Sequence, residues 1–138
     1  MQPFTILDHP ADLGIEARGA TLHEAFENAA RGLVSVILDL STVECQESRV
    51  VEISAADIEQ LLVKWLAEVL YLYDGQRFVG KEFTIGEMTP HRLKATVTGE
   101  QFSVTKHRTK MDVKAITYHQ LLVRQDKDGG LVRVFLDI

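Results

Sequence analysis

Hydrophobic positions recur three or four residues apart in two stretches of this chain, which is the spacing of one face of a helix. The capping-box sequence Thr21-Leu22-His23-Glu24 precedes the first stretch, and the turn pair Asp74-Gly75 follows the second. The pattern predicts one helix over about 22–38 and a second that opens with the box-like start Ser54-Ala55-Ala56-Asp57 and runs to about Tyr73.

The remaining apolar positions form short or alternating runs, which are typical of β-strands. Turn residues at 89–92 and 125–130 predict antiparallel hairpins. Because the helices come early and the hairpins late, the order argues against a doubly wound parallel fold. We expect a single α+β domain over 1–138, a two-layer sandwich of two main helices and a mostly antiparallel sheet. The predicted strands are 4–7, 13–18, 49–53, 82–88, 93–98, 112–124 and 131–137.

Composition limits the cellular location and the binding partners expected for the protein. The chain has 138 residues, enough to bury a core without disulfide bonds, and its single Cys45 cannot form one internally. No apolar run approaches the ~20 residues of a membrane-spanning helix, and the first residues lack the pattern of a signal peptide. We expect a cytoplasmic protein that does not bind membranes. The formal net charge of −5 argues against direct binding of RNA, so the basic stretch 106–110 is interpreted as a solvated loop.

The most distinctive polar cluster is His9-Pro10-Ala11-Asp12-Leu13-Gly14. From Leu13 onwards apolar and polar residues alternate, so the cluster lies on the tight lead-in to a half-buried strand. Functional groups are often carried on loops that a rigid scaffold positions, whereas Asp also commonly does no more than shape a turn. His9 and Asp12 are therefore candidate site residues, with turn formation as the alternative.

The end of the chain offers further oxygen atoms. The sequence Val134-Phe135-Leu136-Asp137-Ile138 finishes inside an apolar strand, so we expect the main-chain carboxylate of Ile138 to be held beside Asp137. With Asp12 these groups would form a set of hard oxygen ligands, which suits Ca²⁺ or Mg²⁺ better than zinc. The sequence does not show that the two ends of the chain meet. His119 is interpreted as a satisfied or partly buried histidine.

Five blocks of the sequence together resemble the signature of the archease family. They follow one another in the family's order and span nearly the whole chain, which makes the set specific although each block alone is weak. The blocks are His9-Pro10-Ala11-Asp12-Leu13-Gly14, Thr21-Leu22-His23-Glu24-Ala25-Phe26-Glu27-Asn28-Ala29-Ala30, Trp65-Leu66-Ala67-Glu68-Val69-Leu70-Tyr71-Leu72, Val113-Lys114-Ala115-Ile116-Thr117-Tyr118-His119 and Phe135-Leu136-Asp137-Ile138.

The resemblance implies an accessory protein rather than an enzyme. Archeases promote the activity of RtcB-type RNA ligases, which join RNA ends in tRNA splicing and RNA repair. They help the ligase to load guanylate from GTP onto its own active-site histidine, and they support its multiple turnover. The family fold is a small α+β sandwich. The expected partner is such a ligase, with RNA and GTP reached only through it.

The resemblance also implies particular site residues. Family members carry a metal site near the chain termini, which falls here on Asp12, Asp137 and the carboxylate of Ile138. We expect a divalent cation there, Ca²⁺ ahead of Mg²⁺ or Mn²⁺.

The family further uses a Lys and an acidic residue ahead of the Lys-Ala-x-Thr-Tyr-His block, and Lys106 and Asp112 resemble those positions. With His9 they are the expected residues for activation of the partner. Two departures stand out. Pro10 replaces the usual Thr, which removes a hydroxyl group and stiffens the loop. Asp112 replaces the usual Glu and is one methylene shorter.

Two other functions remain open on the residues alone. Asp12, Asp137 and His9 would also fit a small metal-dependent phosphoester hydrolase. A chaperone-like binding protein without a metal role is the third possibility.

Overall fold

A computed structural model describes residues 2–8 and 12–138 of the chain. The described part forms two long helices, seven strands and a short 3₁₀ turn, η1 (Leu40–Thr42). In chain order the main elements are β1 (Phe4–Asp8), β2 (Leu13–Gly19), α1 (Leu22–Ile37), β3 (Glu47–Ser54), α2 (Ile58–Asp74), β4 (Phe78–Thr89), β5 (Arg92–Gln101), β6 (Ala115–Asp126) and β7 (Gly129–Asp137).

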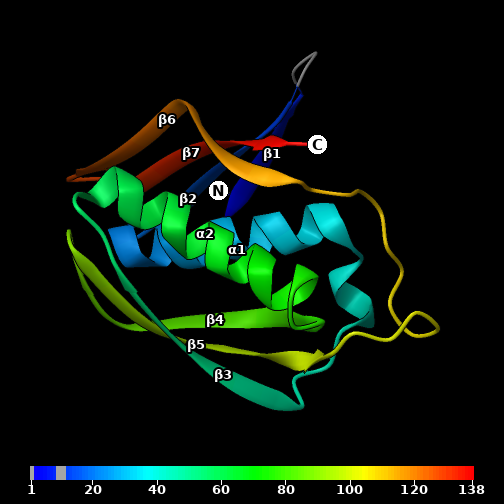
Figure 1. Cartoon of the computed structure of the whole chain (residues 1–138). Coiled ribbons are helices and arrows are strands. Elements are labelled where there is room, and N and C mark those ends of the chain that lie inside the picture. The colour runs from blue at the N-terminus through cyan, green and yellow to red at the C-terminus, as the bar shows by residue number, and fades with distance from the viewer. Residues whose placement is uncertain (1, 9–11) are drawn as a thin grey trace.

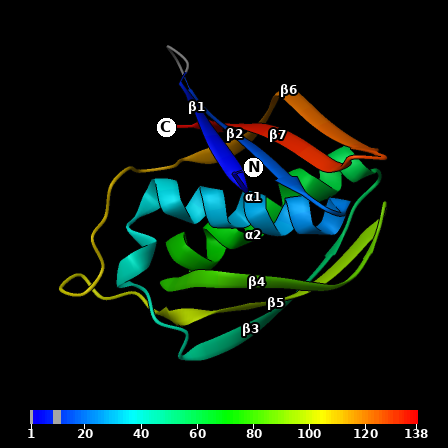
Figure 2. The ribbon, with the colours of Figure 1, turned by 180° about the vertical axis from the view of Figure 1, so that it is seen from behind.

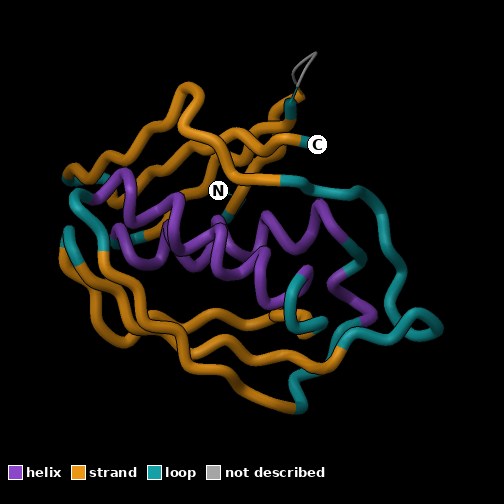
Figure 3. The backbone as a smooth tube through the Cα atoms, in the orientation of Figure 1, coloured by secondary structure: helices purple, strands orange, loops and turns teal. Residues whose placement is uncertain are grey.

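The strands form two antiparallel sheets, one on each side of the helix pair (Figures 1 and 3). The strand order is β1-β2-β7-β6 in the four-stranded sheet and β3-β5-β4 in the three-stranded sheet. Seen from behind in Figure 2, α1 and α2 again lie between the sheets. The predicted α+β class, the two helices and the antiparallel pairing are confirmed. The structure has three layers where two were expected, because the strands divide into two sheets that both cover the helices.

Helix α1 begins where predicted, whereas α2 begins at Ile58, because Asp57 and not Ser54 caps its first turn. The hydroxyl of Thr21 accepts a hydrogen bond from the Glu24 N–H at 3.2 Å, and the carboxylate of Asp57 accepts one from the Gln60 N–H at 2.8 Å. Neither of these helices, which are the long ones in the described chain, has the length and apolarity needed to cross a membrane.

The core lies between the sheets, around the contact of α1 with α2. Trp65 of α2 has no exposed surface, and its indole N–H donates to the carbonyl of Phe26 in α1 at 2.9 Å. The indole also meets the ring of Phe83 in β4 edge-on, with centroids 6.2 Å apart. The Trp65 side chain therefore joins both helices and one sheet, and its polar atom is satisfied despite full burial.

The strand predictions are confirmed in position except in the run 112–124. Strand β6 begins only at Ala115, and its pairing with β7 is interrupted. Thr117 lies opposite Phe135, whereas the next paired residue, Leu122, lies opposite Arg133. Several residues of β6 therefore bulge out of the ladder at this point.

Strands β2 and β7 lie side by side in the middle of the four-stranded sheet, in the register Leu13 with Leu136 and Ile15 with Val134. Ile15, Val134 and Leu136 have no exposed surface. Figure 1 shows the consequence, since the red C-terminal strand runs beside the blue N-terminal strands. The pairing brings the first and last segments of the chain to the same end of the sheet.

Gly14 in β2 lies against the ring of Phe135 in β7, and a Cβ atom at Gly14 would come within 2.9 Å of that ring and 3.0 Å of Leu7. We expect Gly14→Ala to lower the free energy of unfolding by about 1–3 kcal/mol, because the well-packed face cannot accept the added methyl group. In the matched control Gly86→Ala, the nearest atom is 4.0 Å from the added Cβ. Denaturant unfolding measures both variants. Equal stability of the two would contradict the close packing of Phe135 on Gly14.

Candidate functional site

The ends of β2 and β7 place carboxylates together at one edge of the four-stranded sheet. Leu13 pairs with Leu136, so continuing the register by one residue sets Asp12 opposite Asp137. Leu13 and Leu136 are buried in the core. Because side chains alternate along a strand, Asp12 and Asp137 point to the outer face of the sheet. We call Asp12, Asp137 and the main-chain carboxylate of Ile138 the carboxylate edge.

The main chain fixes this edge. The N–H of Lys114 donates to the carbonyl of Asp137 at 2.8 Å, and Ala115 of β6 pairs with the same residue. The chain is therefore held up to its next-to-last residue, as the apolar ending predicts. Asp137 is exposed and Ile138 is 37% exposed, so these two residues face solvent, whereas Oδ1 of Asp12 is buried.

An aromatic pair lies beside the carboxylate edge on the same face. The ring of Phe135, only 4% exposed, covers Gly14, and the imidazole of His119 packs edge-on against it with centroids 5.9 Å apart. The hydroxyl of Thr117 donates to the carbonyl of Phe135 at 2.9 Å and accepts from the His119 N–H at 3.2 Å. Gly14 thus has a packing role in the motif that contains Asp12.

Of the two alternatives predicted for His119, partial burial is wrong, because the residue is exposed, whereas its ring does have a partner in Phe135. The prediction assumed unbroken alternation along 112–124, but β6 bulges after Thr117, and Gln120 takes a left-handed φ of 49°. The bulge brings His119 over Phe135, beside the strand that ends in the carboxylate edge. A single sequence carries no clear signal for such a bulge, so this neighbour of the site was missed.

The carboxylate edge is suited to a hard divalent cation, because all its donors are oxygen atoms. Among residues 2–8 and 12–138, no three His, Cys, Asp or Glu side chains gather as metal ligands. A cation there would need the main-chain carboxylate of Ile138 as well as the two Asp side chains, with water or a partner completing its shell. The donor set fits Ca²⁺, Mg²⁺ or Mn²⁺ and does not fit zinc. His9 and Pro10 lie outside the described residues, so their expected roles stay predictions.

A second polar group is buried at the end of β5. The carboxylate of Glu100 is 7% exposed and accepts three hydrogen bonds, each of 2.8 Å, from the ammonium of Lys106, from Nε2 of His107 and from the main-chain N–H of Glu44. The ammonium of Lys106 also donates to the carboxylate of Glu44 at 2.5 Å. We call Glu44, Glu100, Lys106 and His107 the Glu100 cluster.

The contacts within the Glu100 cluster keep its charges ionised. Burial alone would raise the pKa of Glu100, but the hydrogen bonds from Lys106, His107 and the Glu44 N–H outweigh burial and lower the pKa to about 2. The hydrogen bonds that Lys106 donates to Glu100 and Glu44 raise the pKa of its ammonium. The carboxylate and the ammonium therefore form a charged pair over the whole neutral range.

Lys106 and Asp112 lie away from the carboxylate edge. Both belong to residues 102–114, which leave β5 in one sheet and pass the ends of the helices to β6 in the other (Figure 1). Asp112 is exposed and lies within electrostatic reach of Asp74, whose pKa is raised first by burial and then by the charge of Asp112. The structure thus joins Asp12 with Asp137 and places Lys106 in a separate cluster.

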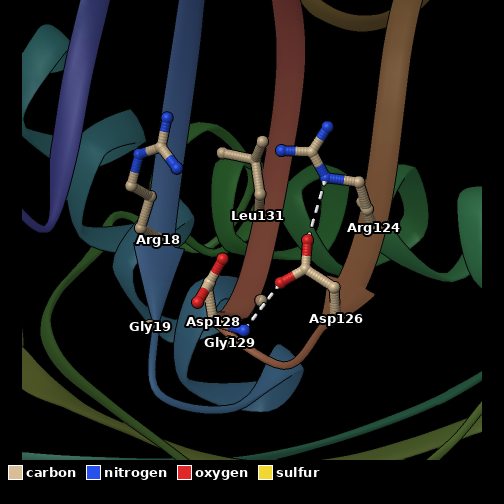
Figure 4. A pocket seen from close by; sticks show the side chains of 8 residues that line it. Arg18, Gly19, Arg124, Asp126, Asp128, Gly129 and Leu131 are labelled. Carbon is tan, nitrogen blue, oxygen red and sulfur yellow. Dashed lines mark hydrogen bonds and ion pairs between the residues drawn. The ribbon is translucent and has the colours of Figure 1, made fainter.

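A cavity of about 140 Å³ lies at the opposite end of β2 and β7. In Figure 4, Arg18 and Arg124 rise on either side of Leu131. Asp126 forms a 3.6 Å ion pair with Arg124 and accepts the Asp128 N–H at 2.8 Å. Asp126 therefore shapes the hairpin turn. The cavity is separated from the carboxylate edge by the length of β2, roughly 20 Å, so it does not extend that site.

The fold and the carboxylate edge define a class of protein, a small α+β sandwich whose second and last strands bring carboxylate groups to one edge of a sheet. The sequence matches the model of the Archease protein family (MTH1598/TM1083) over residues 4–138. The chain belongs to the archease family.

Individual relatives agree with this assignment. The chain is 37% identical to protein archease of Methanosarcina acetivorans, covering 98% of this chain and 95% of that one. It is 40% identical to protein archease of Thermococcus gammatolerans, covering 99% and 98%. The solution structure of Methanobacterium thermoautotrophicum protein 1598 matches over all of both chains with a TM-score of 0.84 and 35% identity. The crystal structure of a Thermotoga maritima archease, described as a possible chaperone, matches 96% of this chain and 94% of that one with a TM-score of 0.66, and its 19% identity supports the fold alone.

The lowered pKa of Glu100 makes stability depend on pH in the acid range. The pKa of Glu100 is about 2 in the folded chain, compared with an ordinary value of 4.5. The ionised carboxylate therefore stabilises the fold above about pH 4.5, and this stabilisation is lost as the pH falls towards 2. We expect Glu100→Gln to cost about 1.5–3 kcal/mol at neutral pH, with the difference from wild type shrinking below pH 4.5. Urea unfolding across this pH range measures the difference.

The control for this measurement is Glu52→Gln, because the Glu52 side chain is 59% exposed and only 3.7 Å from Lys94 in a loose surface pair. We expect that substitution to change stability little at any pH. A Glu100→Gln difference that stays constant from pH 7 to pH 2.5 would contradict the role given to the ionised carboxylate.

Proposed function

We propose that the chain activates an RtcB-type RNA ligase in the cytoplasm. It would promote the loading of guanylate from GTP onto the ligase's active-site histidine, and support multiple turnover in tRNA splicing and RNA repair. The observation that carries the proposal is the β2–β7 register, which sets Asp12 opposite Asp137 beside the last residue of the chain. Membership of the archease family supports the ligase as partner. On this proposal the chain is a protein cofactor and not an enzyme.

The carboxylate edge would hold Ca²⁺, or Mg²⁺ or Mn²⁺ in its place, through Asp12, Asp137 and the carboxylate of Ile138. When bound, such a cation supplies positive charge that neutralises phosphate groups during nucleotidyl transfer. The part played by the chain itself is to hold three carboxylates at a rigid strand end while keeping one side open to solvent and to a partner. The net charge of −5 favours action on RNA and GTP through the ligase rather than directly.

His9, Lys106 and Asp112 are the further residues proposed to contribute to activation. Asp112 is exposed and can meet a partner directly. Lys106 is engaged with Glu44 and Glu100, so its contribution has to be compatible with those two ion pairs.

Asp12→Asn and Asp137→Asn each remove one charge from the carboxylate edge with little change in shape. We expect each to slow formation of the ligase–guanylate adduct by at least about tenfold, the scale on which groups of a metal site affect affinity or activity. The rate is measured with a purified cognate ligase and labelled GTP, and circular dichroism confirms the fold. Asp128→Asn, at the exposed turn of the same sheet, is the matched control and should activate normally.

Normal activation by both variants would show that the carboxylate edge is not the activating site. Phosphoester hydrolysis by the wild-type chain alone, lost in Asp12→Asn, would favour the hydrolase instead. If calorimetry detects no binding of a divalent cation, a chaperone-like binding protein is favoured over the hydrolase.

One glycine added after Ile138 displaces the main-chain carboxylate without altering any side chain. Because the proposed cation site depends on that carboxylate, we expect calorimetry to show Ca²⁺ binding weakened by at least about tenfold. The same glycine placed ahead of Met1 is the control and should leave the affinity unchanged. Equal Ca²⁺ binding by both extended chains would remove Ile138 from the ligand set.

A further inference from the structure

Residues 102–114, which we call the connecting segment, link the two sheets without regular secondary structure. Irregular links of this length in a compact domain are usually functional. Main-chain hydrogen bonds fix the segment at intervals, and the last of them joins it to the carboxylate edge. They run from the Phe102 N–H to the Arg77 carbonyl at 2.6 Å, from Asp39 to Arg108 at 2.9 Å, from Lys110 to Ile37 at 2.8 Å and from Lys114 to Asp137 at 2.8 Å.

The Glu100 cluster holds the first turn of this segment. The N–H of Ser103 donates to Nδ1 of His107 at 2.9 Å, so Nδ1 carries the lone pair and Nε2 carries the proton that is donated to Glu100. The N–H of His107 donates back to the carbonyl of Ser103 at 2.9 Å. The His107 side chain has no exposed surface. A neutral imidazole thus joins the segment's own backbone to the end of β5.

Aromatic and cationic side chains cover the cluster. The ring of Phe102 stacks on His107 with centroids 5.6 Å apart and 29° between the planes. Arg77 lies over the Phe102 ring at 4.7 Å, and Tyr73 meets that ring edge-on at 5.4 Å. These contacts tie the start of the segment to the end of α2, so the cluster is shielded from water on this side.

Lys106 cannot leave the cluster without a penalty. Its ammonium lies between the carboxylates of Glu44 and Glu100, and the Glu100 side chain is only 10% exposed. Moving the ammonium to a phosphate group would leave a buried carboxylate with one charged partner fewer, which is strongly destabilising. The arrangement therefore favours a role for Lys106 inside the chain over direct contact with a nucleotide.

We propose that Glu100, His107 and Lys106 are positioning residues. They hold the connecting segment on the course that presents Asp112 to the ligase and brings Lys114 onto the carboxylate edge. Lys106 acts by closing the Glu100 cluster rather than by touching the ligase or GTP. This inference rests on the proposed function, and it assigns to Lys106 a way of acting that the resemblance does not supply.

The chemistry of the cluster gives a sharp variant. All three groups that meet the Glu100 side chain are donors, and a carboxylate accepts at both of its oxygens. In Glu100→Gln one oxygen becomes an NH₂ group, so a donor must face either Lys106 or the pair formed by His107 and the Glu44 N–H. The variant breaks the cluster while keeping the size of the side chain. Glu52→Gln makes the same chemical change at an exposed pair and is the control.

Amide hydrogen exchange tests the anchoring without any ligase. We expect Glu100→Gln and Lys106→Met to speed exchange at the amides of Ser103 and His107 by at least about tenfold, since each loses a charged hydrogen bond. The amides of Ala95 and Val97 inside β5 should speed by no more than the loss of global stability measured by urea unfolding, and every amide in Glu52→Gln should be unchanged. Unchanged exchange at Ser103 and His107 in Glu100→Gln would overturn the proposal.

Ligase activation tests the positioning. A loosened segment reduces the fraction of molecules competent to bind, so the concentration of Glu100→Gln needed for half-maximal activation should rise by at least about tenfold while the maximal rate stays the same. In an Asp112→Asn background the same substitution should have little further effect, because both changes act on one contact. Half-maximal activation at the wild-type concentration, despite faster exchange, would overturn the proposal.

Lys106→Met separates positioning from contact. If it loosens the segment and weakens activation to the same degree as Glu100→Gln, Lys106 acts through the cluster. A fall in the maximal rate without faster exchange would instead make Lys106 a contact residue and overturn its assignment. If the wild-type chain fails to activate the ligase, the proposed function is wrong, whereas the exchange measurement still decides whether the cluster anchors the segment.

Discussion

The antiparallel pairing of β2 with β7 is the contact on which the rest of the structure depends. It joins Leu13 to Leu136, so most of the chain must be closed into a loop before it forms, at a cost in conformational entropy. Burial of apolar side chains along the two strands offsets that cost, since Ile15 and Val134 lose all contact with water. Every residue proposed to hold a cation lies within two residues of the end of this pairing.

The chain handles its acidic groups in two different ways. At the carboxylate edge, Asp137 and Ile138 lie at an exposed strand end, where water and ions reach them. In the Glu100 cluster, a carboxylate lies inside the protein and is matched by three donors from Glu44, Lys106 and His107. The cost of taking a charge out of water is met there by charge-assisted hydrogen bonds. The carboxylate edge can therefore still bind a cation, whereas both oxygen atoms of Glu100 already accept hydrogen bonds within the chain.

The parts of the fold and of the candidate site that can be predicted from sequence are those that depend on interactions between residues close together in the chain. Capping by Thr21 and the helical spacing behind it are local, so the bounds of α1 are predicted nearly to the residue. The candidate ligands Asp12 and Asp137 could be named as residue types, but their juxtaposition depends on a pairing between opposite ends of the chain. The bulge that exposes His119 leaves no pattern in the alternation. One partner of Lys106, Glu44, could not be predicted either, because it is 62 positions away in the chain.

The carboxylate edge is electrostatically unfavourable by itself, because like charges at one strand end repel. In high dielectric that repulsion is only about 1 kcal/mol for a pair at ~4 Å, whereas moving the strand end would also disturb Leu13 and Leu136 in the core directly behind it. The apolar pairing therefore holds the carboxylates in place. A divalent cation would turn the repulsion into attraction with little rearrangement of the backbone, which is the advantage of a preorganised site. Glu100 cannot bind a cation in this way, because its carboxylate already accepts hydrogen bonds from donors within the chain. The two acidic groups therefore differ in exposure, since Asp137 remains open to solvent whereas Glu100 is buried among its donors.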